Sequence, residues 1–128
     1  MDVARISSIP LFTGLDRHER EQIARWADEV DLPAGYHLLD QGRFAHEFFV
    51  IEEGEVEVRI GDQPVTTLGP GEMLGEIALL KHDTRTASVI ASSPVRAIVM
   101  AAREFEAMRA AMPSIAAQLE AKMQERLG

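Results

Sequence analysis

The first thirty residues have the pattern of amphipathic helices. Asp16 followed by Glu19 has the spacing of a capping box, in which two side chains satisfy free backbone N–H groups at a helix start. Apolar residues then recur at helical intervals, at Ile23, Trp26, Ala27 and Val30. Pro33 and Gly35 interrupt this pattern. We therefore predict N-terminal helices over residues 1–29.

The middle of the chain alternates between apolar and polar residues, which is typical of strands. Residues 55–60 alternate most regularly. Within them, Val56, Val58 and Ile60 are expected to face inward while their neighbours face water. Gly61-Asp62 then predicts a hairpin turn. Further strands are predicted at residues 65–68, 87–91 and 95–100.

Helical spacing returns at Arg103, and Pro113 breaks it at a point where a new helix can begin. The last predicted helix carries apolar residues four apart, at Ile115, Leu119, Met123 and Leu127. Short strands between helical ends predict a mainly β fold, a small β-barrel or jelly roll with an N-terminal helix and C-terminal helices. The length of 128 residues fits one domain. We expect helices over 1–29, the barrel over 30–102 and C-terminal helices over 103–128.

The composition argues against several classes of function. A formal net charge of −8 disfavours nucleic-acid binding by this domain, since such binding normally needs a basic face. The chain has no cysteine, and its four histidines lack the spacing of a metal centre. No catalytic triad, nucleophile elbow or phosphate-binding Walker loop is present. We expect neither an enzyme nor a metal cofactor.

Membrane insertion and export are not indicated either. No apolar run approaches the ~20 residues that span a bilayer. The first residues do not begin a signal peptide. We therefore expect a cytoplasmic protein without a membrane contact.

The segment from Gly75 to Arg85 carries the clearest chemical signal. A glycine turn opens a short apolar helix, and an arginine follows it at the start of a β-prone run. Free N–H groups at a helix start and a guanidinium can together hold a small anion. Glu76 cannot bind that anion and is better suited to accept a hydroxyl proton. A phosphate and a hydroxyl lie side by side in a nucleotide, so the segment favours a nucleotide ligand.

This segment resembles the phosphate-binding cassette of the cyclic nucleotide-binding domain family. The matching residues are Gly75-Glu76-Ile77-Ala78-Leu79-Leu80 and Arg85-Thr86-Ala87-Ser88-Val89, with Arg85 nine positions after Glu76. Residues 9–15, 33–42, 49–58 and 68–72 also resemble the family, so the similarity covers nearly the whole chain. The family includes catabolite activator proteins, regulatory subunits of cyclic-AMP-dependent kinases and cyclic-nucleotide-gated channels.

The resemblance implies that the ligand is cyclic AMP or cyclic GMP. Arg85 would clamp the phosphate, and Glu76 would accept a hydrogen bond from the ribose 2′-hydroxyl. Backbone amides of the turn would complete the phosphate site, and Thr86 would bond the phosphate or the purine edge. The choice of base stays open, because the family has threonine here in members of both specificities. The expected ligand-binding residues are Gly75, Glu76, Ile77, Ala78, Arg85, Thr86 and Ala87.

The C-terminal helices are the expected output of such a sensor. The base would extend toward them and be capped by Met108, Met112, Ile115 or Leu119, and the signal would reach a homodimer partner or a separate effector protein. The alternative is a ligand-free interaction or dimerisation module of the same fold, with the apolar stripe of the last helix as its seam. A transcription regulator would need a helix-turn-helix after that helix. The sequence given stops at Gly128, so we expect an output by protein contact, or a fragment of a longer chain.

Overall fold

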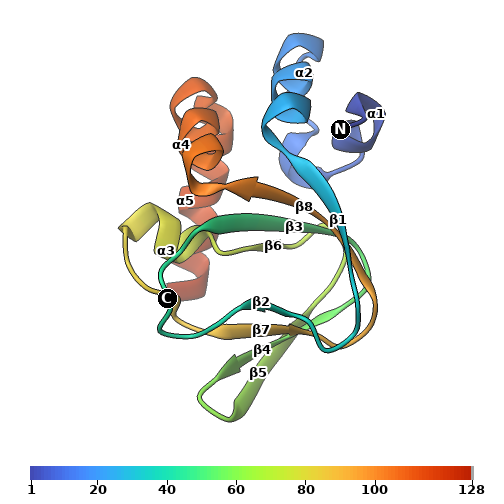
Figure 1. The fold of residues 1–128 in the computed structure, drawn as a ribbon. Coiled ribbons are helices and arrows are strands. Elements are labelled where there is room, and N and C mark those ends of the chain that lie inside the picture. The colour runs from blue at the N-terminus through green and yellow to red at the C-terminus, as the bar shows by residue number, and fades with distance from the viewer. Residues whose placement is uncertain (128) are drawn as a thin grey trace.

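The computed structural model describes residues 1–127 and contains two facing antiparallel sheets with helices packed against one of them (Figure 1). The sheets have the strand orders β1-β8-β3-β6 and β2-β7-β4-β5. The helical segments are α1 (Val3–Ser7), η1 (Pro10–Phe12), α2 (Arg17–Trp26), α3 (Glu76–Lys81), α4 (Ala102–Ala111) and α5 (Pro113–Leu127). The strands are β1 (Asp28–Leu32), β2 (His37–Leu39), β3 (Glu47–Glu53), β4 (Val56–Ile60), β5 (Gln63–Leu68), β6 (Met73–Leu74), β7 (Ser88–Ala91) and β8 (Val95–Ala101). The predicted mainly β jelly roll with helical ends is confirmed.

The capping box at the start of α2 is present. The Glu19 backbone N–H donates to Asp16 Oδ1 at 2.8 Å, and the Asp16 N–H donates to Glu19 Oε1 at 3.1 Å. The helix ends sooner than its apolar spacing indicated, because Val30 lies in β1 and pairs with Ala97 of β8. Strand pairing across the molecule therefore overrides the local helical period at this position.

The inward alternation predicted for β4 holds only in part. Val56 is fully buried, whereas Ile60 is 51% exposed. The pairing of β4 with β7 ends at Arg59, so Ile60 has only the edge strand β5 beside it. Gly61 and Asp62 form the predicted turn between the two strands.

Two apolar clusters hold the molecule together. One lies between the two sheets, and the other joins the outer face of β3 and β8 to the N- and C-terminal helices. The second cluster contains the residues expected to cap a base, Met108, Met112, Ile115 and Leu119, each at most 1% exposed. Their assignment as a base cap is therefore wrong, because packing the helices onto the sheet uses these side chains.

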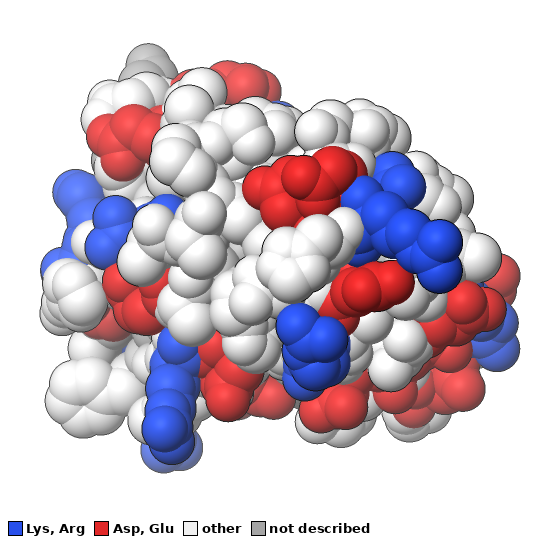
Figure 2. All heavy atoms as spheres, turned by 90° about the horizontal axis from the view of Figure 1, so that it is seen from above, with Lys and Arg blue, Asp and Glu red and all other residues white. Residues whose placement is uncertain are grey.

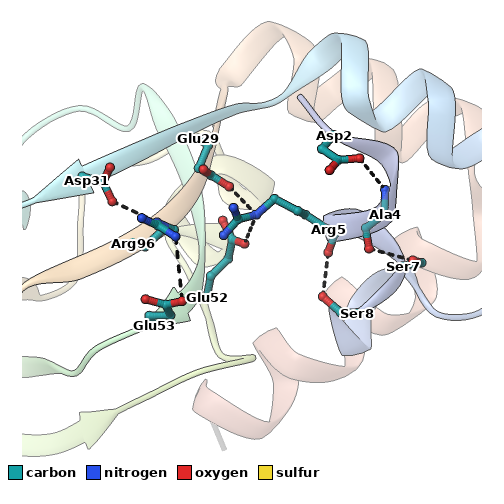
Figure 3. A network of polar contacts seen from close by, with 10 residues as sticks. All are labelled: Asp2, Ala4, Arg5, Ser7, Ser8, Glu29, Asp31, Glu52, Glu53 and Arg96. Carbon is teal, nitrogen blue, oxygen red and sulfur yellow. Dashed lines mark hydrogen bonds and ion pairs between the residues drawn. The ribbon is translucent and has the colours of Figure 1, made fainter.

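Charged side chains fasten α1 to the sheet (Figure 3). Arg5 Nε lies 2.7 Å from Glu29 Oε2 and 3.0 Å from Glu52 Oε2, so one guanidinium bridges β1 and β3. Burial raises the pKa of Glu52, and the Arg5 charge opposes that effect. Arg96 makes a similar contact with Asp31 at 3.0 Å. Figure 2 shows acidic and basic side chains interspersed on the face seen there, so the net negative charge does not form a single patch on it.

Candidate functional site

A cavity of about 210 Å³ lies between the β2-β7-β4-β5 sheet and α3. All of the ligand residues predicted from the sequence line it: Gly75, Glu76, Ile77, Ala78, Arg85, Thr86 and Ala87. The rest of the wall is mostly apolar and comes from Leu39, Val58, Ile60, Val65, Thr66, Leu68, Leu74, Val89 and Arg126. The structure thus brings the two parts of the predicted motif together around one space.

The turn into α3 requires glycine at position 75. Gly75 has a φ of +91°, a left-handed conformation that other residues adopt only with strain. A Cβ atom there would lie 2.7 Å from Arg85 Nη1 and 2.9 Å from the Glu47 carbonyl oxygen. The missing side chain therefore leaves the space in which the arginine guanidinium lies.

Arg85 is a cation held among neutral acceptors. Its side chain is buried, Nη1 donates to the Gly75 carbonyl at 2.9 Å, and Nη2 donates to the Glu47 carbonyl. Within residues 1–127 no carboxylate forms an ion pair with it. Burial lowers the pKa of Arg85, while the charges of Glu47 and Glu76 counteract this, and an arginine stays protonated in proteins. The cavity therefore offers a positive charge that an anion could neutralise.

Glu76 has no exposed surface, and its two oxygens differ. Oε1 accepts a hydrogen bond from Arg126 Nη1 at 2.6 Å, whereas Oε2 is buried and has no partner among the described residues. Burial raises the pKa of Glu76, and the nearby Arg126 charge opposes this. Burying a carboxylate oxygen without a hydrogen-bond donor costs free energy. A hydrogen bond from a ligand hydroxyl would offset this cost.

Arg126 was not predicted from the sequence. It lies in the last turn of α5, fifty positions from Glu76, and its Nη2 is also 3.8 Å from Glu72 Oε2. A basic residue near a helix end is ordinary, because it interacts favourably with the helix dipole. Nothing in the local pattern distinguished this arginine. Only the packing of α5 beside α3 brings it to the cavity.

Neither a metal site nor a membrane span is found in the described part of the chain. No group of three or more His, Asp or Glu side chains there could hold a metal ion. No helix in residues 1–127 is both long and apolar enough to cross a bilayer. The cavity instead combines a buried cation, an open carboxylate oxygen and apolar walls. That combination suits a small molecule with an anionic group, a hydroxyl and a flat apolar part.

A family model described as "Cyclic nucleotide-binding domain" matches residues 29–111. The chain belongs to the cyclic nucleotide-binding domain family. The cyclic nucleotide-binding region recognised by the model covers the barrel, α3 and α4. The resemblance seen in the sequence is confirmed at the level of the family.

Two relatives are regulatory or gated proteins. The chain is 31% identical over 112 residues to a cAMP-dependent protein kinase regulatory subunit of Neurospora crassa, covering 86% of this chain and 29% of the relative. It is 32% identical over 123 residues to a cyclic nucleotide-gated potassium channel of Rhizobium etli, covering 96% of this chain and 34% of the channel. The chain thus spans about a third of the length of these relatives. These matches are to regulatory or binding proteins rather than to catalytic enzymes.

A solved structure with the same fold is the regulatory subunit of a cAMP-independent protein kinase A from Trypanosoma brucei. It superposes with a TM-score of 0.85 at 25% identity, covering 95% of this chain and 46% of that one. The arrangement of barrel and flanking helices is therefore that of a regulatory cyclic nucleotide-binding domain.

Proposed function

We propose that this cyclic nucleotide-binding domain is a sensor that binds cyclic AMP or cyclic GMP in the cavity beside α3 and transmits occupancy through α5. The observation that carries the proposal is the pair of buried groups on one cavity. Within residues 1–127, Arg85 has a charge without a carboxylate partner, and Glu76 has an oxygen without a donor. Arg85 would bind the cyclic phosphate with backbone amides of Gly75, Ile77 and Ala78. Glu76 Oε2 would accept the ribose 2′-hydroxyl, and Thr86 and Ala87 would lie beside the phosphate.

Similar structures support a cyclic nucleotide as the ligand. The regulatory domain of Toxoplasma gondii protein kinase A, which has the same fold (TM-score 0.83, 25% identity), was crystallised with cyclic AMP. In a variant of the Trypanosoma brucei subunit that is bound to cyclic AMP, alanine replaces a glutamate, arginine replaces a threonine seven positions later, and alanine replaces the valine that follows. This chain naturally has Ala78 and Arg85 at that separation. We infer that Arg85 makes the site suitable for a phosphate rather than for an uncharged nucleoside.

Binding isotherms test the proposal. Calorimetric titration of the whole chain with cyclic AMP and cyclic GMP is expected to show saturable binding to at least one of them. 5′-AMP, in which the phosphate ring is open, is the control and should bind more weakly. The proposal is wrong if millimolar concentrations of both cyclic nucleotides produce neither heat nor a thermal shift.

Arg126 connects the proposed ligand site to helix α5. It joins the last turn of α5 to the carboxylate that would hold the ribose. A ligand that binds better when α5 is docked shifts the population toward the docked pose. The effector contacted by α5 would be a separate protein or a second copy of the chain.

Replacing Arg126 with Gln is expected to loosen the end of α5. The hydrogen bond to a buried carboxylate would be weakened, so amide exchange in the last turn of α5 should become about three- to tenfold faster without ligand. Hydrogen exchange measured with and without cyclic AMP checks this, with Glu72→Gln as the control because that outer contact is 3.8 Å long. Equal exchange in Arg126→Gln and the unmodified protein would contradict the coupling through this residue.

The alternative of a ligand-free dimerisation module has less support. Its seam was expected on Ile115, Leu119 and Met123, and these side chains are between 0% and 7% exposed within this one chain. The side chain of Leu127, the fourth member of the stripe, lies outside the described residues. We further propose that the domain is not itself an enzyme. We also propose that it acts in the cytoplasm, which cell fractionation would test.

A further inference from the structure

A second cavity, of about 550 Å³, lies between the N-terminal helices and the end of β3. Residues of α1 and η1, the last three residues of β3, and the loop between β5 and β6 line it. Among the described residues, none lines both this cavity and the one beside α3. The proposed nucleotide site therefore leaves this second cavity unused.

Glu52 brings an unsatisfied carboxylate oxygen to the second cavity. Its side chain is 10% exposed, and Oε2 accepts a hydrogen bond from Arg5 Nε at 3.0 Å. Oε1 is buried and has no hydrogen-bond partner among the described residues. The terminal torsion of a glutamate is broad, so a small rotation can present Oε1 to a donor in the cavity. Because burying an unpaired carboxylate oxygen costs free energy, a ligand that donates to Oε1 would be stabilised.

The charges around the second cavity do not balance. Arg5 Nε also lies 2.7 Å from Glu29 Oε2, so the carboxylates of Glu29 and Glu52 converge on one guanidinium (Figure 3). Glu53 lines the cavity too, and its nearby cation is Arg96, at 3.9 Å. Arg96 is in turn shared with a carboxylate of β1. Two guanidinium groups thus face four carboxylates, and this excess of negative charge favours a cation.

The form of the site favours an ammonium group over other cations. No group of three or more His, Asp or Glu side chains in residues 1–127 could hold a metal ion. A guanidinium binds best to a carboxylate with two free oxygens, whereas Glu52 has one oxygen left. An ammonium has three donors and can bond to single acceptors. Ile9, Pro10 and Pro70 add apolar wall surface along which a methylene chain can lie.

We propose that the second cavity binds an alkylammonium group, which donates to Glu52 Oε1 while its methylene chain lies along the apolar wall. The exposed carboxylate of Glu53 would add electrostatic attraction as the cation approaches. Free amines and lysine side chains share this chemistry, so the test uses one probe of each kind. The proposal goes beyond the nucleotide sensor and does not depend on it.

Amide chemical shifts recorded during a titration with n-butylammonium chloride test the proposal. Saturable shifts are expected at residues that line the cavity, such as Ser8, Glu52 and Gly71. The neutral alcohol n-butanol has a similar length and should bind at least about tenfold more weakly, because it lacks the charge. Nα-acetyl-lysine N-methylamide carries the same ammonium group on a peptide-like unit and should shift the same residues. The tighter of the two amines indicates whether the group belongs to a free amine or to a polypeptide.

Two variants remove separate features of the site. Glu52→Gln removes the charge and is expected to weaken n-butylammonium binding by about 10- to 100-fold, the range for a hydrogen bond to an ionised group. Glu55→Gln is its control, because Glu55 is exposed and does not line the cavity. Ala4→Leu narrows the cavity without changing a charge and should also weaken binding. Its control is Ser7→Leu, at an exposed position of α1 outside the cavity wall.

The outcomes distinguish this proposal from the sensor function. Absence of saturable shifts with both amines would overturn the ammonium site. Equal binding of n-butanol and n-butylammonium would also overturn it, as would unchanged n-butylammonium binding in Glu52→Gln. Cyclic AMP added to the same samples reports separately on the cavity beside α3, so the failure of one proposal leaves the other standing.

Discussion

Replacing Arg85 with Ala is expected to weaken cyclic nucleotide binding by roughly 30- to 1,000-fold. This corresponds to about 2–4 kcal/mol for a buried, charge-assisted contact with the phosphate. The same change removes the hydrogen bonds to the carbonyls of Gly75 and Glu47, which join the start of α3 to the start of β3. The variant should therefore also unfold at a lower denaturant concentration in the absence of ligand.

Calorimetric titration and urea unfolding separate these two effects. Arg17→Ala is the control, because Arg17 lies on α2 with an 86% exposed side chain and forms a surface ion pair with Glu21. Arg85→Lys keeps the charge but cannot donate to both carbonyls and the phosphate in the same fork geometry. We expect Arg85→Lys to bind with intermediate affinity. Unchanged affinity in Arg85→Ala would refute the phosphate role.

Replacing Glu76 with Gln is expected to remove most of the discrimination between ribose and deoxyribose ligands. The unmodified protein should bind 2′-deoxy cyclic AMP about 10- to 100-fold more weakly than cyclic AMP, the range for a hydrogen bond to an ionised group. In Glu76→Gln a neutral acceptor remains, so the difference should fall below about tenfold. Competition titration with both ligands measures it. Equal affinity of the unmodified protein for the two ligands would exclude this role for Glu76.

The effect of the same substitution on the stability of the free protein should depend on pH. Burial raises the pKa of Glu76 above its ordinary value of 4.5, so the ionised form is disfavoured in the folded state. A carboxyl group whose pKa is raised on folding contributes stability below pH 4.5, and this contribution is lost as the pH rises through its folded value. Ionising this carboxyl group therefore costs folding free energy as the pH rises through its folded pKa. Urea unfolding at pH 5 and pH 7 should show Glu76→Gln gaining stability relative to the unmodified protein as the pH increases.

Local signals in the sequence predicted the elements that depend on a few neighbouring residues. The capping box at Asp16 and the turn at Gly61 are examples, since each is specified within a short stretch of chain. The predicted cassette residues all line one cavity, and their contacts with a ligand stay a prediction. The motif is contiguous enough for the resemblance to identify it.

Long-range packing decided the features that the sequence did not predict. Val30 lies in β1 because it pairs with β8, and Met108 lies in the core because α4 packs on the sheet. Arg126 reaches Glu76 only through the docking of α5. Val65 lines the cavity beside Thr66 because of a register shift between β4 and β5. Such contacts join residues far apart in sequence, and no local periodicity specifies them.

The turn at Gly75 restricts which residues evolution can place there. A Cβ atom would lie 2.7 Å from the Arg85 guanidinium and 2.9 Å from the Glu47 carbonyl oxygen, and the φ of +91° disfavours any side chain. A smaller residue at position 85 would remove only the first of these three obstacles. Homologues that have lost the arginine should therefore still keep the glycine, and an alignment should show position 75 to be less variable than position 85.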